Sequence, residues 1–300
     1  MSPPTRAPLI RTLPWREPET VALALARRFG DDGLVWLDGD GTRLGRTCLL
    51  GVDPLEQVRC AGLPGEPGAD DPFARLAELA ASGHTWLGWL AYEAGAWVEP
   101  ASHWKRPALP LLWAARFDPL IRLDLQGQQL QLQGHDPERL DAVARCLLSA
   151  DPVPSATVIA ASARPSIPLS SWRWCTDRQG YADGVMAIRD LIAAGDLFQA
   201  NLSACCEAPW PSSGPEAVLA LYARLRRRCP APFSGLMIAS GGTAPEAILS
   251  ASPERFLQIS ATGAVETRPI KGTRPRHHQP EVDAAAAADL VSSAKDASRQ

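Results

Sequence analysis

The chain has 300 residues and a formal net charge of −3, with 46% hydrophobic and 21% charged residues. This composition is typical of a globular protein with a substantial core and excludes a wholly disordered chain. The slight acidity gives no electrostatic basis for a nucleic-acid or membrane surface, and no apolar run approaches the length of a membrane span.

Targeting and cysteine signals point to a reduced compartment. The first 15 residues contain prolines and arginines but no apolar segment of the kind that signal peptides carry. The seven cysteines are scattered, with no C-x-x-C pair and no zinc-type spacing. A cytoplasmic protein without disulfides is therefore expected.

Helices are predicted where apolar residues recur at helical spacing between start and stop signals, such as Pro18 near the first turn and Gly30 after the last. They are expected at residues 18–29, 73–81, 137–149, 180–194, 215–228 and 281–294. The run of four arginines within residues 224–228 ends one of them, and we interpret it as a solvated face that complements the helix dipole.

Strands are predicted from short apolar or alternating runs bounded by turn residues. They are expected at residues 34–37, 47–52, 85–92, 109–113, 119–125, 128–133, 197–203, 233–239, 247–251, 256–259 and 264–270. Strands dominate and no regular βαβ alternation appears, which predicts an α+β fold with antiparallel sheets. A stretch rich in Pro, Ser and Ala interrupts the pattern, so we expect regions at 1–150 and 171–300 joined by a linker or crossing segment at 151–170.

The lysines are the most informative residues. The chain has 30 basic residues, yet only Lys105, Lys271 and Lys295 are lysines. An amine, unlike a guanidinium, can lose its proton and act as a nucleophile, so a lysine that persists in an arginine-biased chain is a candidate catalytic residue. Lys105, beside Arg106 in a Trp- and Pro-rich loop, is interpreted as an ordinary surface residue.

Lys271 lies on one arm of a predicted hairpin with Thr262-Gly263 as its two-residue tip. In that register Glu254 faces Lys271 across the strands, which pairs an amine with a carboxylate for proton transfer. Gly272 allows a ligand to approach the backbone, and Thr273 and Arg274 add a hydroxyl and a guanidinium suited to a carboxylate-bearing ligand. The alternative interpretation of Glu254 and Lys271 is a simple cross-strand ion pair.

At these residues the chain resembles the chorismate-utilising enzymes, which include anthranilate synthase large component, aminodeoxychorismate synthase component I and the isochorismate and salicylate synthases. The similar segments cover nearly the whole chain and lie at residues 45–54, 88–95, 195–203, 252–256 (Ser-Pro-Glu-Arg-Phe), 267–274 (Thr-Arg-Pro-Ile-Lys-Gly-Thr-Arg) and 293–296. The resemblance implies an anthranilate-synthase-component-I-like fold. It makes residues 1–150 the N-terminal α/β region and residues 171–300 the first part of the chorismate-binding catalytic region.

The residue at position 271 distinguishes activities within the family, which has Ala there in anthranilate synthases and Lys in aminodeoxychorismate synthases. Lys271 therefore implies conversion of chorismate and ammonia to 4-amino-4-deoxychorismate, in para-aminobenzoate and folate biosynthesis. In this role Lys271 adds to C2 of chorismate, Glu254 is the general acid/base, and Gly272, Thr273 and Arg274 bind substrate. Anthranilate or isochorismate/salicylate synthesis is the alternative enzyme activity.

The resemblance also implies a cofactor and a partner, namely Mg²⁺ and a glutaminase subunit that supplies ammonia. Family members run to roughly 450 residues, beyond a typical single domain. The resemblance places the magnesium-binding and glycine-rich segments of the family beyond residue 300, so no metal ligand is assigned in this chain. We therefore expect a C-terminally truncated member of the family. The non-enzyme alternative is an inactive fragment that binds the glutaminase. The family's N-terminal tryptophan site is not carried over, because residues 35–39 depart from its Leu-Leu-Glu-Ser-type segment.

Overall fold

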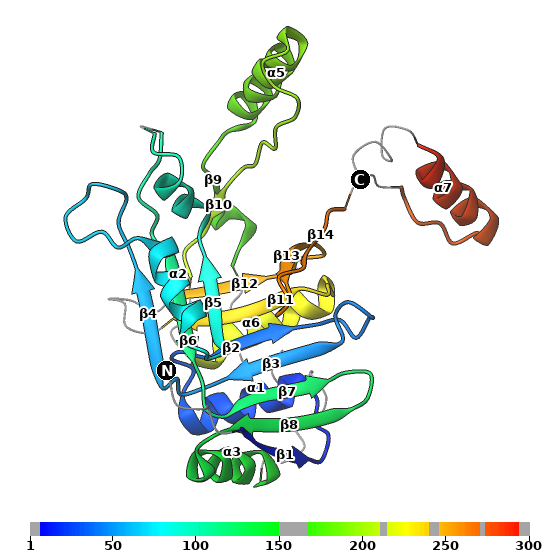
Figure 1. Ribbon diagram of the computed structural model, residues 1–300. Helices are drawn as coiled ribbons and strands as arrows, with labels where there is room; N and C mark the ends of the chain where they lie inside the picture. Colours follow the sequence, from blue (N-terminus) through cyan, green and yellow to red (C-terminus); the bar gives the residue numbers. More distant parts are fainter. Residues whose placement is uncertain are drawn as a thin grey trace.

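The computed structural model describes residues 7–101, 103–149, 167–210, 215–239, 246–270 and 274–293. Its described part combines helices with antiparallel sheets, which confirms the α+β prediction. Two sheets stack on one another, and helices cover the outer face of each (Figure 1).

The larger sheet has seven antiparallel strands in the order β1-β8-β7-β3-β2-β11-β12. Their bounds are Leu9–Leu13, Gln129–Gly134, Leu120–Asp124, Thr47–Gly51, Val35–Asp38, Ser234–Ala239 and Glu246–Ser250. The first five come from the predicted N-terminal region, whereas β11 and β12 come from the predicted catalytic region. Both regions thus contribute to one sheet, and the domain boundaries stay predictions because residues 150–166 lie outside the described residues.

The smaller sheet contains β4 (Glu56–Cys60), β6 (Leu112–Arg116) and β5 (Trp86–Leu90), in that order. Helix α2 (Pro72–Ala81) packs on it through Leu79, and a short 3-10 helix, η1 (Tyr92–Trp97), follows β5 where the sequence predicted a longer strand. Asp71 caps α2 by accepting hydrogen bonds from the backbone N–H groups of Phe73 and Ala74.

The core is divided between the two faces of the larger sheet, and β2 shows how the sequence produces this division. Side chains alternate along a strand, so Trp36 and Asp38 point toward the helices while Val35 and Leu37 point toward the smaller sheet. On that second face, the Trp113 and Trp89 rings stack with their centroids 4.9 Å apart.

Helices α1 (Pro18–Phe29), α3 (Pro137–Ser149) and α6 (Pro215–Arg228) cover the helix-side face of the larger sheet. All three begin and end where the sequence predicts. Each begins with proline, which suits the first turn because its missing N–H would have no partner there. Gly30 follows α1 with a φ of +86°, and its N–H closes the helix on the carbonyl of Ala26.

The remaining elements belong to neither of the two stacked sheets, and α5 and α7 project away from them (Figure 1). They are η2 (Leu169–Ser171), β9 (Arg173–Trp174), α5 (Arg178–Ala194), β10 (Cys206–Glu207), β13 (Arg255–Ile259), β14 (Val265–Arg268) and α7 (Pro280–Ser292). Gly195 caps α5 in the left-handed conformation. No residue of α5 is buried by the part of the chain described, so its predicted apolar face stays exposed.

The strand predictions need correction in two respects. Residues 197–203 are not a strand, and the strands β1, β4, β9 and β10 were not predicted. The backbone of a strand must pair with a neighbour, and residues 197–203 instead run beside α5, where Tyr181 donates a hydrogen bond to the carbonyl of Leu202. Among the helices described, none is long and apolar enough to cross a bilayer.

Leu50, on the central strand β3, tests the helix-side core. Its side chain is 0% exposed, so Leu50→Ala should lower the free energy of unfolding by about 2–5 kcal/mol, because it leaves a cavity. Leu169 is 90% exposed, and Leu169→Ala is the matched control, with an expected change within about 0.5 kcal/mol. Urea unfolding measures both, and equal losses would contradict this assignment of the core.

Candidate functional site

Glu254, the predicted acid/base, lies in the loop between β12 and β13. The loop is fixed to the start of β11, since the N–H of Phe233 donates to the carbonyl of Ser252 at 3.1 Å. The guanidinium of Arg255 also lies over the Phe233 ring, 5.2 Å from its centroid. Glu254 itself is exposed, so the structure holds the backbone of this residue while leaving its carboxylate accessible.

The predicted register of the hairpin is wrong. The loop has three residues rather than two: Ser260 donates its N–H to the carbonyl of Ala264 at 2.8 Å, and Gly263 has a φ of +82°. A third loop residue in the left-handed conformation shifts the pairing by one. A further irregularity between Arg255 and Gln258 shifts it again, so Arg255 pairs with Arg268 and not with position 270.

Of the predicted substrate-binding residues, the structure describes Arg274. Lys271, Gly272 and Thr273 lie outside the described residues, so their roles stay predictions. Arg274 is described, and its Nε donates to the Oδ2 atom of Asp289 in α7. Its guanidinium, which the sequence assigns to a substrate carboxylate, is therefore bound to a carboxylate of this chain.

A cluster of charges holds the two arms of the hairpin together. Glu266 of β14 accepts from Arg268 at 2.7 Å on its own strand and from Arg255 of β13 at 2.5 Å. The hydrogen bonds from Arg268 and then Arg255 lower the pKa of Glu266 to about 2. The carboxylate thus stays ionised near neutral pH and offsets the repulsion between the two opposed arginines.

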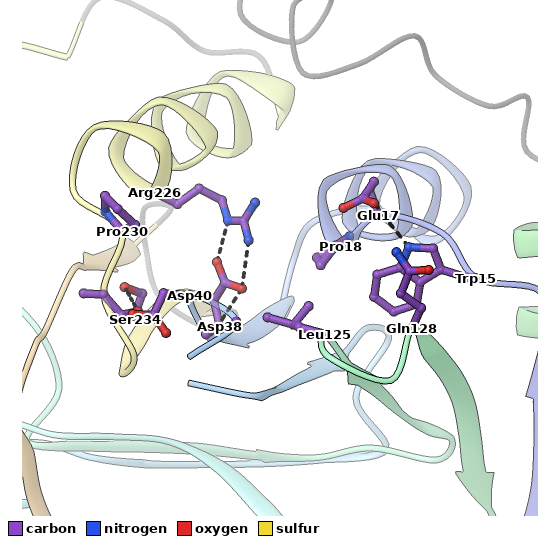
Figure 2. Close-up of a pocket in the computed structure, with 13 residues that line it drawn as sticks. Trp15, Glu17, Pro18, Asp38, Asp40, Leu125, Gln128, Arg226, Pro230 and Ser234 are labelled. Carbon is purple, nitrogen blue, oxygen red and sulfur yellow. Dashed lines mark hydrogen bonds and ion pairs between the residues drawn. The ribbon is translucent and has the colours of Figure 1, made fainter. Parts of the chain in front are cut away.

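A cavity of about 300 Å³ lies where β2 ends, on the face of the larger sheet that the helices cover (Figure 2). Its lining mixes polar and apolar residues and comes from segments far apart in the sequence. The lining residues are Trp15, Glu17, Pro18, Asp38, Gly39, Asp40, Gly41, Leu125, Gln128, Arg226, Pro230, Ala231 and Ser234. The cavity therefore includes Asp38 and Gly39 of the stretch at which the sequence departs from the family's tryptophan site.

Arg226 reaches from α6 to Asp38 at the wall of this cavity (Figure 2). Its Nε lies 2.6 Å from Oδ2 of Asp38 and its Nη2 lies 3.3 Å from Oδ1, while its Nη1 donates to Glu19 of α1 at 3.2 Å. The Asp38 side chain is 1% exposed and that of Arg226 is 21% exposed. The interpretation of residues 224–228 as a wholly solvated face is thus wrong for Arg226, whose charge is paired inside the fold.

Five donors surround the Asp38 carboxylate. Besides two from Arg226, they are the N–H of Gly39 at 2.9 Å, the thiol of Cys48 at 3.0 Å and the hydroxyl of Tyr222 at 3.2 Å. Burial, and then the charge of Asp38, raises the pKa of both Cys48 and Tyr222, which keeps them protonated as donors. Because its lone pairs are already engaged, Asp38 suits a structural anchor better than a general base.

Burial acts to lower the pKa of Arg226, but the charges and hydrogen bonds of Asp38 and Glu19 outweigh burial and raise it. The guanidinium also lies over the Trp36 ring, 5.3 Å from its centroid, and Trp36 in turn makes an edge-to-face contact with Tyr222. The ion pair thus joins β2, α6 and α1 within an aromatic surrounding.

Potential metal ligands gather elsewhere. Among the described residues, one group of three His, Cys, Asp or Glu side chains brings its ligand atoms close enough together to hold a metal ion. It consists of Cys175, Cys205 and Glu207. Mg²⁺ prefers hard oxygen ligands in octahedral geometry, so a site with two thiols does not fit it.

With the fold and these sites described, comparison with known proteins identifies the family. The chorismate binding enzyme family matches residues 45–298. This chain belongs to that family. Enzymes of the family generally depend on Mg²⁺.

Several curated relatives are named aminodeoxychorismate synthases, among them those of Streptomyces griseus and Salmonella typhimurium. That of Streptomyces griseus is 34% identical over 226 residues, which cover 70% of this chain and 29% of the relative. Component 1 of Salmonella typhimurium is 32% identical over 251 residues, which cover 81% of this chain and 49% of the relative. The chain spans about half the length, or less, of these relatives.

A solved structure supports the fold. Anthranilate synthase component I from Streptococcus pneumoniae matches with a TM-score of 0.59 and 21% identity, covering 85% of this chain and 58% of that chain. At this identity the likeness concerns the fold alone, and it confirms the predicted anthranilate-synthase-component-I-like architecture.

The Asp38–Arg226 pair yields a testable prediction. Arg226→Met leaves a buried carboxylate without its counter-charge and should lower the free energy of unfolding by about 3–5 kcal/mol. Arg228 is exposed on the same helical turn, and Arg228→Met should change stability by no more than about 0.5 kcal/mol. Chemical denaturation compares the two variants, and similar midpoints would argue against a structural role for the pair.

Proposed function

We propose that this chain carries out aminodeoxychorismate synthase chemistry, the conversion of chorismate and ammonia to 4-amino-4-deoxychorismate. Membership of the chorismate binding enzyme family supports chorismate as the substrate. The names of the two relatives, which align over 70% and 81% of this chain, support the amination reaction.

The observation that carries the proposal is Lys271 in the run Pro-Ile-Lys-Gly-Thr at residues 269–273. Anthranilate synthases of the family are expected to have alanine at this position, and alanine offers no nucleophile. Lysine offers an amine. A chain with three lysines among 30 basic residues retains one of them at this position. The amine must be partly neutral to react, so the bound substrate and surrounding groups have to lower its pKa by desolvation.

In the first step the neutral amine of Lys271 forms a bond to C2 of chorismate. The ring double bonds shift, the C4–oxygen bond breaks, and Glu254 donates a proton so that the hydroxyl leaves as water. The attached nitrogen releases one proton and becomes a secondary amine. In the second step ammonia forms a bond to C4 and gives up one proton, the double bonds shift back, and the C2–nitrogen bond breaks as the Lys271 nitrogen takes up one proton.

The described residues support the assignment of Glu254 through access and anchoring. Its carboxylate is exposed, while the bond between Phe233 and Ser252 and the contact between Arg255 and Phe233 hold its loop. Gly272, Thr273 and Arg274 are proposed to bind the substrate carboxylates, which requires Arg274 to exchange Asp289 for substrate. No step is assigned to Mg²⁺, because the one metal-ligand cluster among the described residues contains two thiols and does not suit it.

A glutaminase is the proposed source of ammonia. The Salmonella typhimurium relative is named component 1, which supports a separate second component. The chain's own chemistry consumes free ammonia, so ammonium salts can replace this partner in an assay. The alternative activity, anthranilate formation, draws support from a Synechocystis relative named anthranilate synthase component I-like protein, 27% identical over 310 residues. The identity of the aminated product separates the two.

Covalent trapping tests the proposal most sharply. With chorismate and Mg²⁺ but no ammonia, the chain should accumulate an adduct of chorismate less one water, located on the peptide that contains Lys271. Adding ammonium ions should discharge it and release 4-amino-4-deoxychorismate. Intact-mass and peptide mass spectrometry measure the adduct, and chromatography identifies the product.

Lys271→Ala should abolish the adduct and reduce product to background. Lys105 is exposed, and Lys105→Ala is the matched control that should retain both. Glu254→Gln should slow product formation by about 10²–10⁴-fold, the usual contribution of a general acid/base. Turnover that persists in Lys271→Ala contradicts the covalent role. A chain that neither forms the adduct nor turns over chorismate supports the inactive, glutaminase-binding alternative.

A further inference from the structure

The short sheet formed by β9 and β10 carries a cluster of reactive side chains that the proposed function does not use. Cys206 pairs with Trp174 and Glu207 with Arg173, and the N–H of Cys175 donates to the carbonyl of Cys205 at 2.8 Å. The ladder thus continues by one residue and sets Cys175 opposite Cys205.

Alternation places the reactive groups on one face. Cys205 and Glu207 are two residues apart on one strand, and the residues opposite them, Cys175 and Arg173, project to the same side. Cys206 lies between them in sequence and projects to the other side. Arg173 donates to a carboxylate oxygen of Glu207, which fixes the orientation of that carboxylate.

The ligand atoms are close enough to share one ion. The two sulfur atoms and a carboxylate oxygen of Glu207 all lie within 4.8 Å of one another. Thiolates around a tetrahedral Zn²⁺ lie about 2.3 Å from the metal, and hence about 3.8 Å from each other. Small side-chain rotations would therefore bring the three groups into coordination, and their exposure leaves room for a water as fourth ligand.

The charges at this face also favour a cation. With both thiols deprotonated, Cys175, Cys205 and Glu207 carry three negative charges, and the ion pair with Arg173 supplies one positive charge. The positive charge of Arg173 therefore balances only one of these three negative charges. A divalent cation would let both thiols ionise without repulsion.

We propose that Cys175, Cys205 and Glu207 form a binding site for a soft divalent cation of the Zn²⁺ type, with Arg173 positioning the carboxylate. Binding replaces the two thiol protons, which are released to solvent, and involves no oxidation or reduction. The site is distinct from the family's magnesium requirement, because thiolate ligands select Zn²⁺ over Mg²⁺. Sequence spacing did not reveal it, since the two cysteines come from separate strands.

Cobalt substitution tests the site in the full chain. Titration with Co²⁺ under anaerobic, thiol-free conditions should give one equivalent of thiolate-to-cobalt charge-transfer absorption, which Zn²⁺ then removes. Cys175→Ser and Cys205→Ser should each abolish this absorption, and Glu207→Gln should weaken Co²⁺ binding about tenfold or more. Cys206→Ser is the matched control on the opposite face and should leave the titration unchanged.

A second measurement needs no variant. Zn²⁺ should protect Cys175 and Cys205 from alkylation by iodoacetamide while leaving the exposed Cys229 reactive, as read by peptide mass spectrometry. The affinity for Co²⁺ should also rise with pH, because the thiols must lose protons to bind. Absence of the charge-transfer absorption in the wild-type chain, or its equal loss in Cys206→Ser, would overturn the proposal.

Discussion

The buried ion pair between Asp38 and Arg226 is the constraint on which the arrangement of the fold depends. The two residues are 188 positions apart in the sequence, and their contact joins strand β2 to helix α6, which precedes β11. A buried charge without its partner is costly, so α6 has one favourable position over the sheet once Asp38 is buried. Glu19 extends the pair to α1, and Tyr222 and Cys48 complete the shell of donors.

This anchor connects directly to the candidate catalytic loop. Asp38 pairs with Ser234 across the sheet, and the preceding residue, Phe233, binds the carbonyl of Ser252 and contacts Arg255. Glu254 lies between those two residues. The position of the proposed acid/base is therefore set, through a short series of contacts, by an ion pair in the body of the fold. The hairpin beyond it has few such contacts, and α5 and α7 have none that bury a residue among those described.

The sequence predicted the elements whose signals are local. Helices α1, α3 and α6 combine apolar periodicity with proline starts, and their predicted bounds agree with the structure. Features that depend on distant partners were missed. Arg226 was interpreted as solvated because no local signal points to Asp38. The composition of residues 197–203 favours a strand, but the structure provides no neighbouring strand for them to pair with. The hairpin register differs from the prediction because Gly263, in the left-handed conformation, belongs to a three-residue loop. The prediction assumed a two-residue turn.

Backbone hydrogen exchange at Phe233 tests most directly whether the ion pair sets the position of the Glu254 loop. Arg226→Lys keeps the positive charge but loses the two-pronged contact with Asp38, and should leave the chain folded. The account predicts faster exchange of the Phe233 amide, which bonds to Ser252, together with the amides that join β2 and β11. Unchanged exchange at Phe233, with faster exchange confined to α6, would contradict it.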